Sequence, residues 1–297
     1  MNERMRIFDR ALVRRRRERF ARELAGHDFL VREVAERLVD RLEDIRRPCG
    51  RTLCLGGPAS LIAPMLEGRF GIERLVVADR VAGMLAGSGG SAVVLDEEAV
   101  PFGPDSFDAV LGLMTLHWVN DLPGTLVQLR GCLAPDGLLL LACPGGETLL
   151  ELRQALTEAE LACEGGASPR VSPFADVRDA GSLLQRAGFA LPVVDVDRVT
   201  VSYGDAFRLM RDLGRMGESN ALLQRRPGPL RRATVAQACR IYQERFGDAE
   251  GRVPATFDIL FLTAWKPHES QPKPLPRGSG RISLAEALRS PGKEPPI

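Results

Sequence analysis

The chain has few histidines, no closely paired cysteines and no long apolar run, and each shortage excludes a kind of protein or site. Its three histidines lie far apart in the sequence, so nothing predicts the pair that a two-histidine, one-carboxylate iron site needs. Its six cysteines are scattered without a CxxC pair, which predicts reduced, mostly buried thiols rather than disulfides or a metal centre. We therefore predict no metal site. The residues concerned are His27, His117, His268, Cys49, Cys54, Cys132, Cys143, Cys163 and Cys239.

Charge and hydropathy exclude two further classes. The formal net charge is +1, from 40 basic and 39 acidic residues, so no excess of positive charge points to nucleic acid. No stretch reaches the roughly 18 apolar residues of a membrane span. Residues 1–17 lack the apolar core of a signal peptide, and Glu3 and Asp9 argue against a transit peptide. The run Arg14–Arg17 is expected to be a solvated helix face rather than a docking patch. We expect a cytoplasmic protein with no membrane span and no nucleic-acid partner.

The centre of the chain predicts an α/β fold. At 297 residues and 44% hydrophobic composition, the chain can bury a sizeable core as one large domain or two small ones. Residues 107–114 and 138–143 are nearly continuous apolar runs, typical of strands that helices cover on both faces. Between them a helix begins near Pro123 and ends before the turn Pro135–Gly137. The segment is therefore one right-handed βαβ unit.

Further apolar runs extend this unit to a seven-stranded, mostly parallel sheet. We expect the other strands at residues 51–57, 73–79, 92–95, 193–203 and 255–265, and helices at 11–24, 30–45, 150–163 and 176–187. The chain would then divide into a helical segment at residues 1–47, a domain at 48–266 and a mostly disordered tail at 267–297. A helical insertion at 204–252, before the last strand, is well placed to be a lid.

Candidate ligand residues follow the predicted strands. Ligands of open α/β sheets bind beyond the carboxyl ends of the strands. Gly56 and Gly57 follow the first strand, and Asp79 ends the second, 23 positions after Gly56, near the spacing of a ribose-binding acid. Asp79 could instead cap a helix or pair with Arg80. After the third and fourth strands come Asp96, Glu97 and the step Thr115–Trp118, with the alternative that these are a loop acid and core residues.

The string LDEEAVPFGPDSFDAVLGLMTLHWVND, residues 95–121, resembles class I S-adenosylmethionine-dependent methyltransferases. The resemblance implies a Rossmann-like class I methyltransferase fold and S-adenosylmethionine as the cofactor. Its implied contacts are Gly56, Gly57, Asp79, Asp96, Glu97, Leu113 and Trp118.

The glycine loop departs from the pattern of this superfamily. Pro58 and Ser60 stand where the second and third glycines of GxGxG would be, and Cys54 replaces the acid before them. Pro58 also has no N–H to donate to a ligand. These substitutions leave the affinity for the cofactor open.

Further strings resemble a narrower family, the methyltransferase-like protein-arginine hydroxylases that assist the assembly of respiratory complex I. The similarity runs from about Met5 to Leu288. It implies hydroxylation of an arginine in an iron–sulfur subunit of complex I, which would be the partner. His117, Trp118, Asn120 and Asp121 match the family's step after strand four, and residues 217–220 match its insertion signature. The strings are IFDRALVRRRRERFA, LHWVNDLP, GGETLLELR, EGGASPRVSPF, LLQRAGF, MGESN, VPATFDI and KPHESQPKPLPRGSGRISLAEAL.

Two acids are the candidate catalytic residues. A substrate arginine would require carboxylates for its guanidinium group, and Glu218 or Asp121 could pair with it in bidentate fashion. Both could equally be turn or capping acids. Three functions stay open: an arginine hydroxylase, a methyltransferase acting on a small or carrier-bound acid, and a non-catalytic assembly chaperone. Pro58 and Ser60 favour the chaperone, because they replace glycines of the cofactor loop. The oligomeric state is not legible from the sequence.

Overall fold

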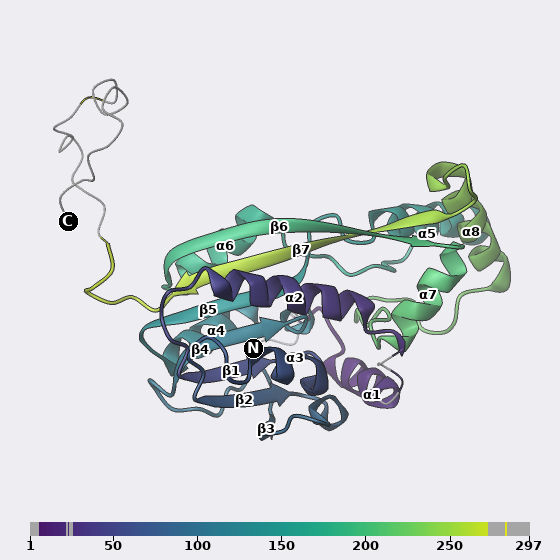
Figure 1. The fold of residues 1–297 in the computed structure, drawn as a ribbon. Coiled ribbons are helices and arrows are strands. Elements are labelled where there is room, and N and C mark those ends of the chain that lie inside the picture. The colour runs from purple at the N-terminus through teal and green to yellow at the C-terminus, as the bar shows by residue number, and fades with distance from the viewer. Residues whose placement is uncertain (1–5, 22, 24–25, 273–282, 284–297) are drawn as a thin grey trace. The chain divides into compact units, whose positions relative to one another are not determined.

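The computed structural model describes residues 6–21, 23, 26–272 and 283 (Figure 1). Its contacts separate a compact unit, Met1–Pro267, from a second unit, His268–Ile297. The predicted disorder of residues 267–297 falls largely outside the described residues, and the predicted divisions at residue 47 and at 204–252 stay predictions. Within the described part of the chain, no helix is both long and apolar enough to cross a membrane.

The first unit is built on a seven-stranded sheet, as predicted. The strand order is β3-β2-β1-β4-β5-β7-β6. Strands β1 to β5 pair in parallel, whereas β7 runs antiparallel to both β5 and β6. The strands are β1 (Arg51–Leu55), β2 (Arg74–Asp79), β3 (Ser91–Val94), β4 (Phe107–Leu113), β5 (Leu133–Gly145), β6 (Ala190–Tyr203) and β7 (Val253–Trp265).

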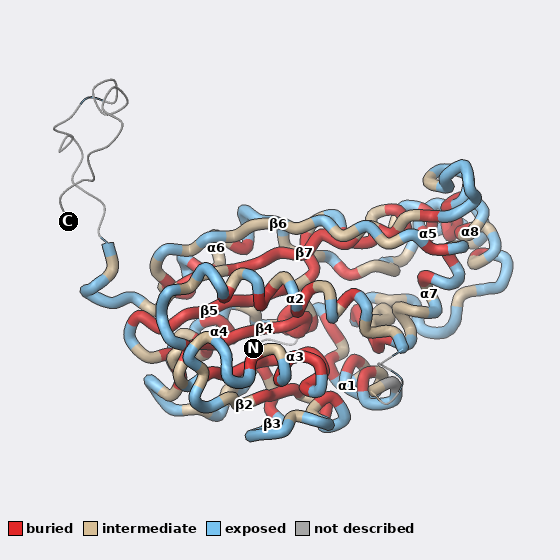
Figure 2. Tube along the Cα trace, in the orientation of Figure 1, coloured by how far each residue is buried: buried red, intermediate tan, exposed pale blue. Residues whose placement is uncertain are grey.

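Helices cover both faces of this sheet, which explains the continuous apolar runs of its central strands (Figure 2). Side chains of α2, α3, α5 and α8 join one core cluster, and those of α4 and α6 join another on the opposite face. The helices are α1 (Arg10–Phe20), α2 (Phe29–Glu43), α3 (Ala59–Leu66), α4 (Leu122–Cys132), α5 (Leu150–Glu164), α6 (Val177–Arg186), α7 (Ala206–Arg215) and α8 (Arg232–Phe246), with short 3-10 turns at Ala82–Leu85 and Leu116–Trp118.

The observed elements follow the predicted ones closely, with one irregularity. The predicted turn at Pro135–Gly137 falls inside the bounds of β5, which begins at Leu133. There Asp136 has a φ of 60°, and the β4–β5 register shifts between Phe107 and Ala109. The turn therefore exists as an irregular start of the strand and not as a separate loop.

Candidate functional site

The register of the parallel strands brings three predicted residues to one edge of the sheet. Leu55 pairs with Ala78, and Asp79 pairs with Val94. The Gly56 N–H also donates to the Ala78 carbonyl at 2.8 Å. Gly56, Asp79 and Asp96 thus follow the carboxyl ends of three adjacent strands, the edge at which such sheets bind ligands.

The turn after β1 requires its two glycines. Gly56 and Gly57 both have a φ of 74°. A Cβ atom on Gly56 would lie 2.6 Å from the Leu113 carbonyl oxygen, and one on Gly57 would lie 2.5 Å from a methyl carbon of the Leu113 side chain. A side chain at either position would therefore force the turn away from the end of β4. Leu113 is a buried core residue at the end of β4 and packs directly against this turn.

The acids after β2 and β3 differ in their surroundings. Asp79 is 1% exposed, and one of its carboxylate oxygens accepts the Val81 N–H at 2.7 Å. Burial raises the pKa of Asp79, and nearby Arg17 only partly opposes this effect. Burial also acts on Asp96, but the Glu98 N–H and the Arg10 guanidinium outweigh it and lower its pKa. The second Asp79 oxygen has no hydrogen-bond partner among the described residues and is free to accept one.

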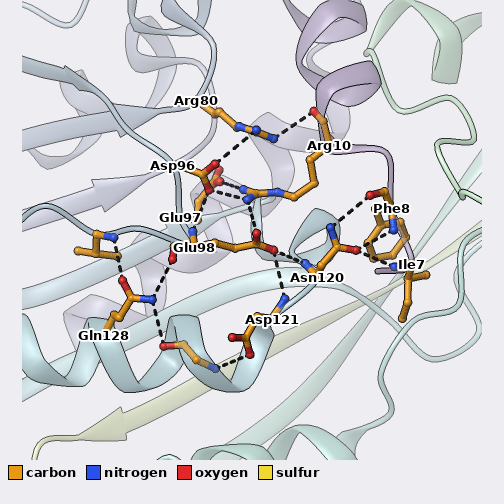
Figure 3. Close-up of polar contacts among 12 residues, drawn as sticks. Ile7, Phe8, Arg10, Arg80, Asp96, Glu97, Glu98, Asn120, Asp121 and Gln128 are labelled. Carbon is orange, nitrogen blue, oxygen red and sulfur yellow. Dashed lines mark hydrogen bonds and ion pairs between the residues drawn. The ribbon is translucent and has the colours of Figure 1, made fainter. Parts of the chain in front are cut away.

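Arg10, the first residue of helix α1, reaches the acids at this edge (Figure 3). Arg10 forms ion pairs with Asp96, Glu97 and Glu98, while Arg80 pairs with Asp96 and not with Asp79. Glu97 is buried and also accepts the Thr115 hydroxyl at 2.9 Å. Each of the three acids is therefore paired with a cation of the chain, although two arginines serve three carboxylates.

The prediction that Arg14–Arg17 forms a solvated face is wrong for its last residue. Arg14 and Arg15 are exposed, but Arg17 is buried and lies between Asp79 and Glu218. Counting charges along the sequence could not separate these residues. The available signal was helical spacing, since Arg10, Val13 and Arg17 recur at three and four positions and share the buried face.

Asn120 fixes the segment before α1. Its side-chain oxygen accepts the N–H groups of Ile7 and Phe8, both at 2.8 Å, and its amide nitrogen donates to the Phe8 carbonyl (Figure 3). The Phe8 ring packs edge to face on Trp118, with ring centroids 5.3 Å apart. Trp118 and Asn120, which follow strand β4, thus hold the N-terminal segment against the sheet edge.

Glu218 lies at the centre of a second polar cluster. Its carboxylate accepts the Trp118 indole N–H at 2.7 Å and contacts His117 Nε2 at 3.0 Å, and Arg17 Nε is 3.7 Å away. Burial alone would raise the pKa of Glu218, but His117, Arg17 and Trp118 outweigh it, and the pKa lies below its ordinary value. Glu218 is therefore an ionised acceptor at neutral pH.

A cavity of about 300 Å³ with a mainly apolar lining lies against this cluster. Among the described residues that line it, Glu218 is the one carboxylate. Gly57, Pro58, Met84 and Met114 form the wall at the sheet edge. The other lining residues are Arg17, Leu30, Val31, His117, Trp118, Pro144, Thr148, Leu149, Leu152, Leu156, Arg170, Val171, Ser172, Phe174, Met210, Leu213, Met216, Ser219, Asn220, Leu230 and Phe257.

Other predicted residues lie outside this wall. Asp121 is the exposed N-cap of α4, where its carboxylate accepts the Gly124 N–H at 2.9 Å. Asp79 and Asp96 do not line this cavity and instead form ion pairs with Arg17 and Arg10. Glu97 lines a separate small cavity of about 20 Å³. Within the described ranges, no three His, Cys, Asp or Glu side chains gather as metal ligands would. The ligand and catalytic roles of the predicted residues stay predictions.

Comparison with known proteins first defines the class. A family model for a methyltransferase domain matches residues 53–141. A solved structure from Bacillus halodurans C-125, described as a methyltransferase, superposes with a TM-score of 0.54 at 15% identity and covers 77% of this chain and 99% of its own. The sheet order and this likeness define the class I methyltransferase fold.

Sequence identity then narrows the class to a family. The chain is 43% identical over 289 residues to arginine-hydroxylase NDUFAF5, mitochondrial, of Danio rerio, covering 95% of this chain and 89% of that protein. It is 32% identical over 268 residues to a malonyl-[acyl-carrier protein] O-methyltransferase of Gallionella capsiferriformans, covering 84% and 90%. The chain belongs to the NDUFAF5 arginine-hydroxylase family, whose members are enzymes on a methyltransferase fold.

Proposed function

We propose that this protein hydroxylates an arginine of an iron–sulfur subunit of respiratory complex I during assembly, acting in the cytoplasm with S-adenosylmethionine bound at the sheet edge. Beside the family membership, one observation carries the proposal. Glu218, from the MGESN signature, is an ionised carboxylate in the wall of an otherwise mainly apolar cavity.

This arrangement suits an arginine side chain. A guanidinium group pairs best with a carboxylate held in fixed orientation, and His117 and Trp118 hold Glu218 in this way. The aliphatic stem of the arginine would contact apolar wall residues such as Leu152 and Phe257. We assign the guanidinium to Glu218 rather than to Asp121, because Asp121 serves as a helix cap on the exposed surface.

The proposed cofactor residues are those predicted from the sequence. Asp79 would accept a ribose hydroxyl through its free oxygen, Asp96 and Glu97 would lie near the adenine, and the Gly56–Gly57 turn would approach the methionine portion. Leu113 supports that turn, and Trp118 lines the cavity next to it. When bound, the cofactor supplies a sulfonium centre with an electrophilic methyl group. Replacing an aliphatic C–H by C–OH also consumes an oxidant as a co-reactant.

Peptide mapping by mass spectrometry tests the reaction. The complex I iron–sulfur subunit would be isolated from a strain lacking this gene and from the same strain carrying the wild-type gene. We expect one arginine to gain the mass of one oxygen atom only when the gene is present. An unmodified arginine in both strains contradicts the proposal.

A second candidate function is methyl transfer to a carrier-bound acid, favoured by the 32% identity to a malonyl-carrier methyltransferase. It predicts the mass of a methyl group on an acyl-carrier substrate and no oxygen on the subunit. The third candidate, a chaperone without cofactor, rests on Pro58 and Ser60. Calorimetric titration with S-adenosylmethionine separates it from the two enzymes, since only the enzymes bind the cofactor.

A further inference from the structure

Arg17 is a buried cation between two candidate sites. Its Nη1 atom lies 3.7 Å from a carboxylate oxygen of Asp79, and its Nε atom lies 3.7 Å from Glu218. Both distances exceed those of charge-assisted hydrogen bonds. The Arg17 Nε atom and the facing Asp79 oxygen have no hydrogen-bond partner in the described part of the chain. Arg17 therefore shares one positive charge between the two acids and forms a hydrogen bond with neither of them.

Arg17 also divides the space at the sheet edge. It lines the cavity of about 300 Å³ that contains Gly57 and Glu218. It equally lines the cavity of about 20 Å³ that contains Glu97 and Thr115. Trp118 lines both cavities as well, so an extended ligand that reaches from the Glu97 end to the Gly57 turn has to pass between Arg17 and Trp118 or displace one of them. In this state the two halves of the proposed cofactor site are separated.

The attachment of α1 is mainly polar. Among its described side chains, the buried ones are Arg10, Val13 and Arg17, and of these three Val13 joins an apolar cluster, with Leu12 packed beside it. Arg16 donates to the carbonyls of Ser219 and Asn220 at 2.9 and 2.6 Å, which ties the helix to the MGESN turn. A helix that buries little apolar surface costs less to displace than a core helix does.

The MGESN turn is shaped to fit against α1. Gly217 has a φ of 78°, and a Cβ atom there would lie 2.9 Å from Arg17 Cα and 2.7 Å from Arg17 Cγ. The turn that presents Glu218 to the cavity is thus the same turn that presses on Arg17. Movement of α1 has to alter the surroundings of Glu218.

We propose that Arg17 is an internal occupant of the guanidinium position beside Glu218 and that its withdrawal opens both the cofactor site and the substrate site. The inference rests on the proposed function, since it places the guanidinium of the substrate arginine where Arg17 now lies. A ribose hydroxyl on Asp79 removes one partner of Arg17, and a substrate guanidinium on Glu218 replaces the other. Cofactor binding therefore favours substrate binding, and substrate binding favours cofactor binding by the same factor.

Calorimetric titration with S-adenosylhomocysteine, a stable demethylated form of the cofactor, tests the gate. Arg17→Met keeps much of the aliphatic bulk and removes the charge, and Arg15→Met is an exposed control on the same helix. A gate that is open about one tenth of the time weakens apparent binding about tenfold. We expect Arg17→Met to bind about tenfold more tightly than wild type, and Arg15→Met to match wild type. Equal or weaker binding by Arg17→Met overturns the inference.

A reversible cross-link tests the same movement with Arg17 left intact. Phe8 and Leu222 are directly opposed in an antiparallel bridge, flanked by the bonds Asp9 N–H to Ala221 O and Leu223 N–H to Ile7 O. Such pairs lie close enough for a disulfide. In a Phe8→Cys, Leu222→Cys double variant, we expect the oxidised protein to bind S-adenosylhomocysteine at least about tenfold more weakly than the reduced protein. Equal affinity in the two redox states overturns the inference.

Hydrogen exchange of α1 shows whether the helix opens or closes when the ligand binds. A gate predicts faster amide exchange in residues 10–20 of the wild-type protein when S-adenosylhomocysteine binds. Slower exchange would mean that α1 closes as a lid over the ligand, which overturns the inference. None of these measurements requires hydroxylation. The gate and the proposed function can therefore fail separately, because oxygen addition can persist when the affinity of Arg17→Met is unchanged.

Discussion

The Glu218→Gln substitution separates the charge of the candidate guanidinium acceptor from its shape. Glutamine keeps the length of the side chain and one acceptor oxygen. It loses the negative charge that Trp118 and His117 contact at 2.7 and 3.0 Å and that lies 3.7 Å from Arg17. The variant therefore tests whether an ionised carboxylate at this position stabilises the fold around the cavity.

The magnitude follows from these contacts. Hydrogen bonds to a charged acceptor contribute about 1.5–3 kcal/mol each, and burial of the charge offsets part of the sum. Both bonds end on the same oxygen, Oε2, so the amide oxygen of the variant can still accept them, but as weaker bonds to a neutral group. We therefore expect Glu218→Gln to lower the free energy of unfolding by about 2 kcal/mol at pH 7.

The lowered pKa of Glu218 determines how the stability difference between wild type and variant changes with pH. The folded-state pKa of Glu218 lies below the ordinary value of 4.5, so the ionised form stabilises the protein above that value, and the stabilisation is lost as pH falls through the folded-state pKa. The difference between wild type and Glu218→Gln should be full at pH 7 and shrink below about pH 4.

Urea unfolding of the purified proteins measures this difference at a series of pH values. Glu244→Gln is a matched control, because Glu244 forms an exposed ion pair with Arg240 on α8. The control should change the free energy of unfolding by less than about 0.5 kcal/mol. Equal stability of Glu218→Gln and wild type at pH 7, or a difference that grows towards low pH, would refute the reasoning.

Three further predictions concern a turn, a helix cap and a buried acid of strand β7. Gly217→Ala should cost about 2 kcal/mol more in urea unfolding than Gly165→Ala, because both glycines have positive φ but only Gly217 lies against a neighbouring helix; equal costs would contradict the contact. Asp121→Asn keeps a capping side chain, so it should change stability by less than about 0.5 kcal/mol and leave arginine modification intact by peptide mapping; loss of modification would return Asp121 to the catalytic candidates. Asp258→Asn should cost about 1 kcal/mol at pH 7 and nothing well below pH 4 in the same unfolding assay, since hydrogen bonds from Arg198 lower the pKa of Asp258; an equal cost at both pH values would contradict this.

The sheet could be predicted because its strands are buried on both faces. Apolar runs such as residues 107–114 and 138–143 are shorter than most helices, which favours strands, and the family resemblance implies seven strands in one sheet. The convergence of Gly56, Asp79 and Asp96 could be predicted for the same reason, since the ends of parallel strands share one edge.

The cover of the site could not be predicted in the same way. Arg10 and Arg17 bury their charges because they pair with acids that lie 62 or more positions away along the chain, at the end of β2, after β3 and in the MGESN turn. Sequence distance hides such pairs, and a cluster of four arginines usually lies in solvent. An acid before a helix can be a cap or a catalytic residue, and the sequence around it looks the same in both cases. The capping role of Asp121 therefore could not be predicted.

The most direct test of the central claim is quantitative peptide mapping of the complex I iron–sulfur subunit from a deletion strain that carries either the wild-type gene or Glu218→Gln. Protein levels of the two forms would be matched by immunoblot, and Glu244→Gln would serve as the control. We predict one added oxygen on a single arginine with the wild type and the control, and at least about a hundredfold less with Glu218→Gln, as expected when a buried charge pair to the substrate is lost. Full oxygen addition by Glu218→Gln would contradict the assignment of this cavity as the arginine site.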